Sequence, residues 1–277
     1  MKSVSSEVLK TLQGVTGAYN LHDVFRDFVI MSMCAIHNSV PMNSSKKLEL
    51  KYIEIAKKYK PETIKAMSKA LAELKDEYDA ILNGNTLWHD VLGEIYMQSD
   101  TSNNKTGQFF TPFSVSQACA RTIVTRESYE EWTQGDPDGV ATMMEPTCGS
   151  GGMILAVAER MNELGVNYSW NMLVNANDID ERCVAMTYLQ CSFLGIPAII
   201  THGNGLTLEM WSEVHTPAYI FGYLHFERQM KLKKESLSVP IGTARDNPKM
   251  EPKKPETGNA WKMPTKVTAM AEQLSLF

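Results

Sequence analysis

Three short segments of this sequence combine residue types that suit the binding of a nucleoside. Residues 145–152 contain glycines at 149, 151 and 152, which permit a tight turn where a ligand can approach bare backbone. Asp178 offers two acceptor oxygens that suit ribose hydroxyls, and the amide of Asn204 can both donate to and accept from an adenine ring. Singly, each segment is a weak signal, because a glycine turn can serve packing alone and Asn is common in loops. Asp180 is either a second acceptor or a helix cap.

These segments follow three predicted strands. The strands are expected at Val140–Glu145, Met172–Asp178 and Ala198–His202. Helices are expected between them, over Met153–Leu164 and Glu181–Leu194. Alternating strands and helices predict an α/β fold with a parallel sheet, whose ligands bind outside the carboxyl ends of the strands. We therefore expect the three segments to meet at one edge of the sheet.

The preceding part of the chain reads as helices. Apolar residues recur at helical spacing over 23–36, 46–60, 61–81 and 88–97, which predicts a helical region spanning residues 1–100. Pro61 suits the first turn of its helix. Ser114 is expected to cap a helix that runs to about Arg126.

Composition limits the class of protein. The chain has 277 residues, 43% of them hydrophobic, which excludes a fully disordered or collagen-like chain. The apolar stretch Val24–Ile36 contains Arg26 and Asp27 and is too short to span a membrane, and no signal peptide is recognised. The five scattered cysteines lack a CxxC pair. They predict reduced thiols, no zinc site and a cytoplasmic protein.

The net charge of −5 is unevenly distributed. Residues 231–272 contain nine Lys and Arg against five Asp and Glu, so the acidic excess lies in residues 1–230. An acidic body does not favour non-specific binding of nucleic acid, although a locally basic cleft remains compatible with specific binding.

Several segments together resemble a known family. The methylation subunits of type I restriction-modification systems are similar to this sequence at Trp88–Tyr96, Thr106–Pro112, Glu145–Gly152, Asp178–Ile196 and His202–Leu206. These subunits are adenine-N6 DNA methyltransferases that use S-adenosylmethionine. The resemblance implies a Rossmann-like methyltransferase fold over residues 101–230, with DNA as the substrate.

The resemblance also implies roles for individual residues. The methionine end of the cofactor would be held by Phe110, Thr111 and Pro112. The floor under its amino-acid portion would be formed by Glu145, Pro146, Gly149 and Gly151. Asp178 would bind the ribose and Asn204 the adenine, a position where the family commonly has an acid.

One family feature is missing. Enzymes of this family hold the target amine with Asn/Asp-Pro-Pro-Tyr/Phe after the fourth strand, and this sequence contains no such tetrapeptide. The near matches are Thr216-Pro217-Ala218-Tyr219 and Asp246–Lys249, and Trp211–His215, before the first, is no obvious buried strand. A threonine hydroxyl cannot reproduce the geometry of an amide. Thr216, Pro217 and Tyr219 are therefore weak catalytic candidates, the alternative being a loop that leads into a strand at Tyr219–Phe226.

The predicted sheet is shorter than that of the family. Only one further strand, near Tyr219–Leu224, fits before the sequence becomes polar. A truncated sheet leaves an exposed edge that the helical region or another chain must cover. We therefore expect self-association or binding to other restriction-modification subunits.

Residues 231–277 form the last predicted region. The stretch 231–272 has five prolines and few large apolar residues, which predicts disorder. Gln273-Leu274-Ser275-Leu276-Phe277 matches the consensus peptide by which bacterial polymerases and repair proteins bind the replication sliding clamp. Leucine and phenylalanine would fill a pocket on the clamp, with glutamine hydrogen-bonding at its rim.

Two functional hypotheses follow. The first is an adenine-N6 DNA methyltransferase, brought to new DNA by the sliding clamp. The second is an inactive cofactor-binding module that docks on the clamp or on methyltransferase subunits. The missing tetrapeptide favours the second, and the cofactor motifs favour the first.

Overall fold

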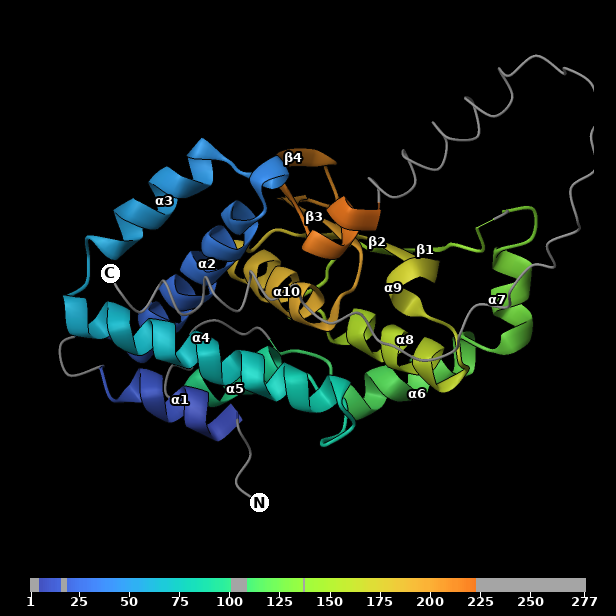
Figure 1. Cartoon of the computed structure of the whole chain (residues 1–277), viewed down its shortest axis with the longest axis horizontal. Helices are drawn as coiled ribbons and strands as arrows, with labels where there is room; N and C mark the ends of the chain where they lie inside the picture. Colours follow the sequence, from blue (N-terminus) through green and yellow to red (C-terminus); the bar gives the residue numbers. More distant parts are fainter. Residues whose placement is uncertain (1–4, 16–18, 101–108, 137, 223–277) are drawn as a thin grey trace, which may run out of the picture.

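The computed structural model describes residues 5–15, 19–100, 109–136 and 138–222. Its amino-terminal part is helical, as predicted (Figure 1). The helices here are α1 (Ser5–Gln13), α2 (Leu21–Ser39), the 3-10 turn Pro41–Asn43, α3 (Lys46–Ala56), α4 (Pro61–Leu82) and α5 (Val91–Asp100). Pro61 opens α4 as predicted, whereas α3 ends earlier than the predicted residue 60. The residue before a proline avoids helical backbone, so the chain leaves the helix before Pro61.

The described residues that follow include a sheet of four strands. Its strands are β1 (Ala141–Glu145), β2 (Met172–Asp178), β3 (Ala198–Asn204) and β4 (Glu209–His215), which lie side by side in that order. β1, β2 and β3 are parallel to one another, which confirms the predicted α/β fold, and β4 is antiparallel to β3. The carboxyl ends of β1, β2 and β3 therefore lie at the same edge of the sheet.

The fourth strand is not where the sequence predicts it. The expected strand at Tyr219–Phe226 is wrong, because residues 217–222 are helical, and Glu209–His215 forms the strand instead. Most side chains of β4 are exposed, so it lacks the continuous apolar run of a buried strand. Thr216 caps the helical segment through Tyr219 N, which donates to Thr216 Oγ1 at 3.4 Å, and Pro217 suits the first helical turn.

The helix predicted from Ser114 to about Arg126 ends earlier, at Ile123, and a second helix follows it. The structure has α6 (Phe113–Ile123) and α7 (Arg126–Trp132), and Pro112 rather than Ser114 precedes the first of them. Thr125 and Ser128 form a reciprocal capping box that starts α7. This local pairing satisfies the first amides of a new helix, which ends the preceding one.

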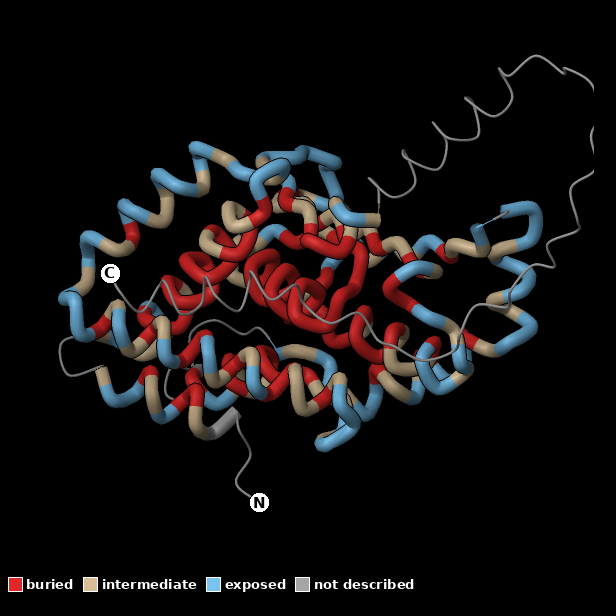
Figure 2. The backbone as a smooth tube through the Cα atoms, viewed as in Figure 1, coloured by how far each residue is buried: buried red, intermediate tan, exposed pale blue. Residues whose placement is uncertain are grey.

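Helix α10 (Glu181–Leu194) lies at the centre of the molecule. Every residue from Cys183 to Leu194 is buried, and Figure 2 shows the buried backbone concentrated along α10 and α2. α10 packs on β2 and β3, and α2 packs on α10. α8 (Gly152–Glu163) packs on α6, and the short α9 (Tyr168–Asn171) precedes β2. Because α10 is surrounded by protein, its apolar residues do not form a single stripe.

One hydrophobic core joins the helical region and the sheet. It contains Phe28 of α2 and Tyr78 of α4 together with Val174 of β2 and Leu189 of α10. The predicted division near residue 100 coincides with residues 101–108, outside the described residues, and stays a prediction. The predicted limits of the last region, 231–277, also lie outside them.

The sheet has an unpaired edge among the described residues. There β1 pairs with β2 alone, and Met144 of β1 is 69% exposed. What covers this edge stays a prediction. Among the described residues, no helix is both long and apolar enough to cross a bilayer, and no cluster of metal-ligating side chains is present. All five cysteines are free thiols.

The interhelical contact of His89 generates a prediction about pH. His89 Nε2 lies 2.9 Å from Glu77 Oε1 of α4, and Nδ1 lies 3.1 Å from Glu94 Oε1 of α5. Burial lowers the pKa of His89, but its hydrogen bonds to Glu94 and Glu77 outweigh burial and raise it above 6.5. The stabilisation is therefore fully present below pH 6.5 and is lost as the pH rises through the raised pKa.

We expect His89→Gln to reduce the free energy of unfolding more at pH 6 than at pH 8.5, measured by urea denaturation. Lys69→Gln, which removes an exposed ion pair with Glu73 on α4, should show no such dependence on pH. An equal loss at both pH values for His89→Gln would contradict a charged His89 in this contact.

Candidate functional site

The turn after β1 has the backbone conformation that its glycines permit. Gly149 has φ +55° and Gly151 has φ +97°, a region that residues with a side chain rarely adopt. A Cβ at Gly149 would lie 3.0 Å from the Phe110 ring, and one at Gly151 would lie 3.2 Å from Thr187 Oγ1. Gly151 precedes α8, whose start has no side-chain cap, so its first amides remain available to an anion.

Asp178 lies at the end of β2, against this turn. Gly149 N donates to its Oδ2 at 2.8 Å, and Asp180 N donates to its Oδ1 at 2.9 Å. The residue is 8% exposed. A carboxylate oxygen can accept more than one hydrogen bond, so both oxygens retain acceptor capacity for hydroxyl groups of a ligand.

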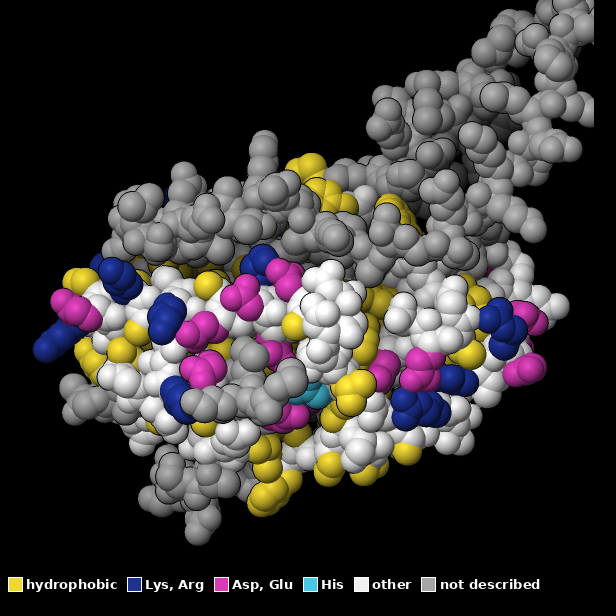
Figure 3. Space-filling model, turned by 60° about the horizontal axis from the view of Figure 1, so that its bottom comes forward, with side chains coloured by type: hydrophobic (Ala, Val, Ile, Leu, Met, Phe, Trp, Pro, Cys, Tyr) yellow, Lys and Arg dark blue, Asp and Glu magenta, His cyan; other side chains and the backbone are white. Residues whose placement is uncertain are grey.

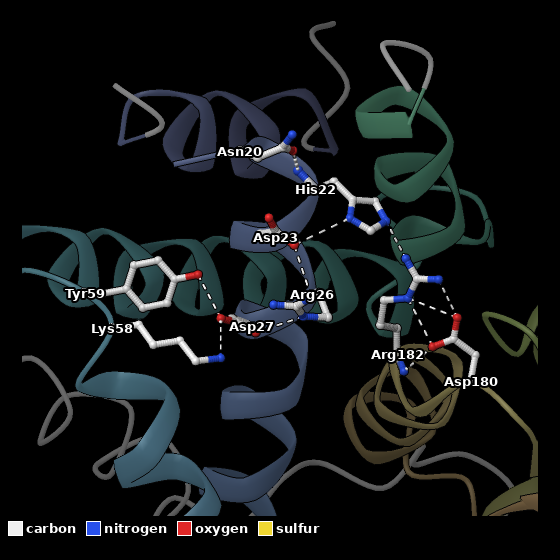
Figure 4. A network of polar contacts seen from close by, with 9 residues as sticks. All are labelled: Asn20, His22, Asp23, Arg26, Asp27, Lys58, Tyr59, Asp180 and Arg182. Atoms are coloured by element: carbon white, nitrogen blue, oxygen red, sulfur yellow. Dashed lines mark hydrogen bonds and ion pairs between the residues drawn. The ribbon is translucent and has the colours of Figure 1, made fainter. Parts of the chain in front are cut away.

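Asp180 has a structural role. Its Oδ1 accepts from Arg182 N at 2.9 Å, which caps α10, and its carboxylate pairs with the Arg182 guanidinium (Figure 4). Arg182 also contacts His22 Nε2 of α2 and lies 5.5 Å from the centre of the Tyr96 ring. Of the two readings of Asp180, these contacts support the helix cap.

Asn177, which the sequence analysis does not single out, joins the three strand ends. Its Nδ2 donates to Pro146 O at 3.0 Å, after β1, and to Gly203 O of β3 at 3.3 Å. Its own carbonyl accepts from Cys148 N at 2.9 Å. Side chains alternate along β2, so Asn177 faces away from Asp178 and bridges the strands on the other face. In the sequence, only its position directly before Asp178 could have indicated that Asn177 belongs to the site.

Asn204 ends β3 at the same edge of the sheet. Its Oδ1 accepts from Leu206 N at 2.9 Å and from Thr207 N at 3.2 Å, which holds the loop that leads to β4. The amide oxygen therefore shapes the loop, and the amide nitrogen is the group suited to contact a ligand. Ile179 is 58% exposed beside Asp178 and supplies an apolar surface that the sequence analysis does not use.

Phe110 is brought beside the glycine turn from a distant part of the chain. Its ring packs against Tyr96 of α5 at a centroid distance of 4.9 Å and faces Gly149. Thr111 and Pro112, which follow Phe110, and Pro146, which follows β1, are exposed. Their predicted contacts with the cofactor stay predictions. The rest of that motif, residues 106–108, lies outside the described residues.

Two acidic side chains, Glu145 and Asp178, lie near each other at the site. Burial raises the pKa of Glu145, a hydrogen bond from Thr147 N opposes this, and the nearby Asp178 raises it further. Among the residues that the structure describes, neither Glu145 nor Asp178 forms an ion pair with Lys or Arg. By contrast, burial raises the pKa of the Cys148 thiol to about 12, so this thiol stays neutral. The electrostatics of this edge favour a ligand with a cationic group.

The weak catalytic candidates lie at the other end of the sheet. Thr216 Oγ1 donates to Ile196 O at 2.9 Å and accepts from Ala198 N at 2.9 Å, where β3 begins. From Ala198 to Asn204 is six residues of strand, or roughly 20 Å. Thr216 and Pro217 are buried, and Tyr219 follows them, so the fold does not bring this segment to the cofactor motifs. The second near match, at 246–249, lies outside the described residues.

A cavity of about 300 Å³ lies beside the predicted site. It is bounded by α2, α3, α10, β3 and β4, and His37, Lys51, His202 and Trp211 line it. None of the predicted cofactor residues lines this cavity. The strand-end residues and this cavity are therefore separate features of the surface.

The protein has an α/β fold in which a glycine turn after β1, an acid after β2 and an amide after β3 lie at one edge of the sheet, an arrangement that suits a nucleoside ligand. The model of the family described as N-6 DNA methylase matches residues 87–247, more than half of the chain. The chain therefore belongs to the N-6 DNA methylase family, a family of methyltransferases. The match begins just before Trp88 and extends beyond the resemblance seen in the sequence, which ends at Leu206.

A solved structure is also similar to the chain. It is described as a class I S-adenosylmethionine-dependent methyltransferase from Listeria monocytogenes, with 12% identity and a TM-score of 0.36. The similarity covers 73% of this chain and 54% of that one, so the chain spans about half of that protein. These values are too low to support an argument about function. A search of curated proteins finds no match.

S-adenosylmethionine is the methyl donor of this family and the cofactor of this chain. The residues fit it on two counts. The uncapped start of α8 suits a carboxylate, and Glu145 with Asp178 suits a cationic ammonium group. The assignment of individual contacts belongs to the proposal below.

The contact between Gly149 and Phe110 generates a prediction. Gly149→Ala places a methyl group against the Phe110 ring in addition to forcing a left-handed residue, whereas Gly165→Ala, at φ +74°, meets no atom within 4 Å. Left-handed backbone costs about 1–2 kcal/mol, and overpacking typically adds about 1–3 kcal/mol. We expect Gly149→Ala to lower the free energy of unfolding by at least ~1 kcal/mol more than Gly165→Ala in urea denaturation. Equal losses would show that the Phe110 ring yields without cost.

Proposed function

We propose that this chain binds S-adenosylmethionine at the carboxyl edge of β1, β2 and β3 and takes part in methylating adenine N6 in DNA. The observation that carries the proposal is the convergence of the glycine turn, Asp178 and Asn204 at one edge, in a chain of the N-6 DNA methylase family. Its segments resemble the methylation subunits of type I restriction-modification systems, so we propose that class, acting in the cytoplasm.

The proposed roles follow from the chemistry of each group. The start of α8 would bind the carboxylate of the cofactor, and Glu145 its ammonium group. Asp178 would accept from the ribose hydroxyls, and Asn204 Nδ2 would donate to an adenine ring nitrogen. Phe110, held against Tyr96, would bound the methionine end. When bound, the cofactor supplies an electrophilic methyl group.

The described residues at the cofactor motifs do not include the predicted catalytic candidates. A flipped adenine requires acceptors for its amino group in line with the methyl group, and Thr216 lies at the other end of the sheet with its hydroxyl bonded to backbone. This placement favours a second candidate function, a cofactor-binding module without turnover. It would act by docking on another methylation subunit or on a second copy of this chain.

Asp178 provides the test of cofactor binding. We expect the purified full chain to bind S-adenosylmethionine in calorimetry and Asp178→Asn to weaken binding at least about tenfold, because a charged acceptor is lost. Asp27→Asn, a change in a buried acid of α2, is the matched control and should bind normally. Affinity should also fall as the pH drops through the raised pKa of Glu145. A wild-type chain that fails to bind overturns both candidate functions.

Turnover separates the two candidates. The full chain is incubated with labelled cofactor and DNA of mixed sequence, with and without candidate methylation subunits. The enzyme proposal expects label on adenine N6 that Asp178→Asn reduces and Tyr219→Ala leaves unchanged. Cofactor binding without transfer to DNA under any of these conditions supports the module.

The sliding clamp is a separate proposed partner. The pentapeptide Gln273–Phe277 lies outside the described residues, and its match to the clamp-binding consensus is the support for this proposal. We expect deletion of residues 273–277 to abolish binding to immobilised bacterial clamp, whereas changing Lys262 and Lys266 to Ala should retain it. Loss in both variants would indicate a charge interaction instead of pocket binding, and retention in the deletion variant would exclude the peptide.

A further inference from the structure

A buried polar cluster lies directly behind the glycine turn. It consists of Asp90, Ser150, Gln190 and Tyr78, which we name the Asp90 cluster, and no member is more than 5% exposed. Asp90 precedes α5, Tyr78 belongs to α4, and Gln190 belongs to α10. Three segments that are distant in sequence therefore meet at the one turn expected to hold the cofactor.

Ser150 is held in this cluster by both of its polar groups. Its Oγ donates to Asp90 Oδ2, and its carbonyl accepts from Gln190 Nε2 at 2.6 Å. Gln190 Nε2 also donates to Asp90 Oδ1 at 2.8 Å. Ser150 stands between Gly149 and Gly151, the two residues with positive φ, so its orientation sets the path of the turn.

The other side of the turn faces the proposed site. Gly149 N donates to Asp178 there, while the next residue is bound to Asp90 from behind. Two carboxylates from distant segments thus hold successive residues of the turn. Two missing side chains leave room for Asp90: a Cβ at Gly93 would lie 2.1 Å from Asp90 Oδ2, and one at Gly152 would lie 3.2 Å from it.

The Asp90 carboxylate accepts every hydrogen bond that it forms in the cluster. Gly93 N and Gln190 Nε2 both donate to its Oδ1, and Ser150 donates to its Oδ2. The Gln190 amide is oriented by its other contacts, since its Oε1 accepts from Tyr78 OH at 2.7 Å. Removing the carboxylate would leave the Gly93 amide and the Ser150 hydroxyl without their acceptor, and would leave Gln190 Nε2 with Ser150 O alone, which is costly in a dry interior.

We propose that Asp90 is a positioning residue that fixes the glycine turn through Ser150 and so sets the affinity for S-adenosylmethionine. The statement about affinity rests on the proposed function, whereas the statement about the turn does not. The inference makes the helical region a working part of the cofactor site, because Asp90 and Tyr78 both come from it.

Hydrogen exchange of the full chain without cofactor tests the effect on the turn. We expect Asp90→Ala to speed exchange of the amides in residues 147–152 at least about tenfold and to weaken cofactor binding at least about tenfold. Asp90→Asn should largely restore both, because its amide oxygen can accept from Gly93 N and Gln190 Nε2, and its NH₂ can donate to the Ser150 hydroxyl. Ser150→Ala, a smaller change that removes the hydroxyl alone, serves if Asp90→Ala fails to fold.

The matched control is Asp27→Ala. Asp27 is a buried acid of α2 that accepts from Tyr59 OH at 2.9 Å and pairs with Arg26 and Lys58, away from the turn (Figure 4). Asp27→Ala should lower the free energy of unfolding without selectively speeding amide exchange in residues 147–152 and without changing the affinity for S-adenosylmethionine. Comparable effects of Asp27→Ala and Asp90→Ala on the turn would overturn the positioning role. If the wild-type chain binds no cofactor, the proposed function falls, and the exchange comparison still decides what Asp90 does.

Discussion

The arrangement of this protein depends on keeping the carboxyl ends of three neighbouring strands in register. Strand pairing aligns the backbones within the sheet. Residues beyond the strand ends are not aligned by this regular pattern of hydrogen bonds. Asn177 supplies the missing connection, since one amide group bonds to the segment after β1 and to the end of β3. The glycine turn, Asp178 and Asn204 all lie next to residues that Asn177 holds together.

The helices contribute more than cover for the sheet. α10 is buried along most of its length, with β2 and β3 on one side and α2 on another, so it links the two parts of the chain. Its amino-terminal end is fixed by Asp180, Arg182 and His22. On the face shown in Figure 3, Lys and Arg side chains are interspersed with Asp and Glu, in keeping with an acidic body that has no extended basic field in this view.

Much of the fold could be predicted from periodicity and turn residues. β2 and α10 have the predicted bounds, because an alternating strand ends at Asp178 and a helix ends at Gly195, whose φ of +68° suits glycine. β4 could not be predicted, since an exposed edge strand has no apolar pattern. The convergence of the cofactor motifs at one edge follows from strand polarity. Asn177, Gln190 and the contact of Asp90 with Ser150 depend on tertiary proximity, which a single sequence does not encode locally.

The reversed direction of β4 has a consequence for the path of the chain. β3 carries the backbone toward the cofactor edge, and β4 carries it back, so Thr216 starts from the opposite rim of the sheet. A later segment would need about six extended residues, or roughly 20 Å, to cross that distance again. Residues after Thr216 must therefore make this second crossing before they can contribute a group to the site proposed at the carboxyl edge of β1, β2 and β3.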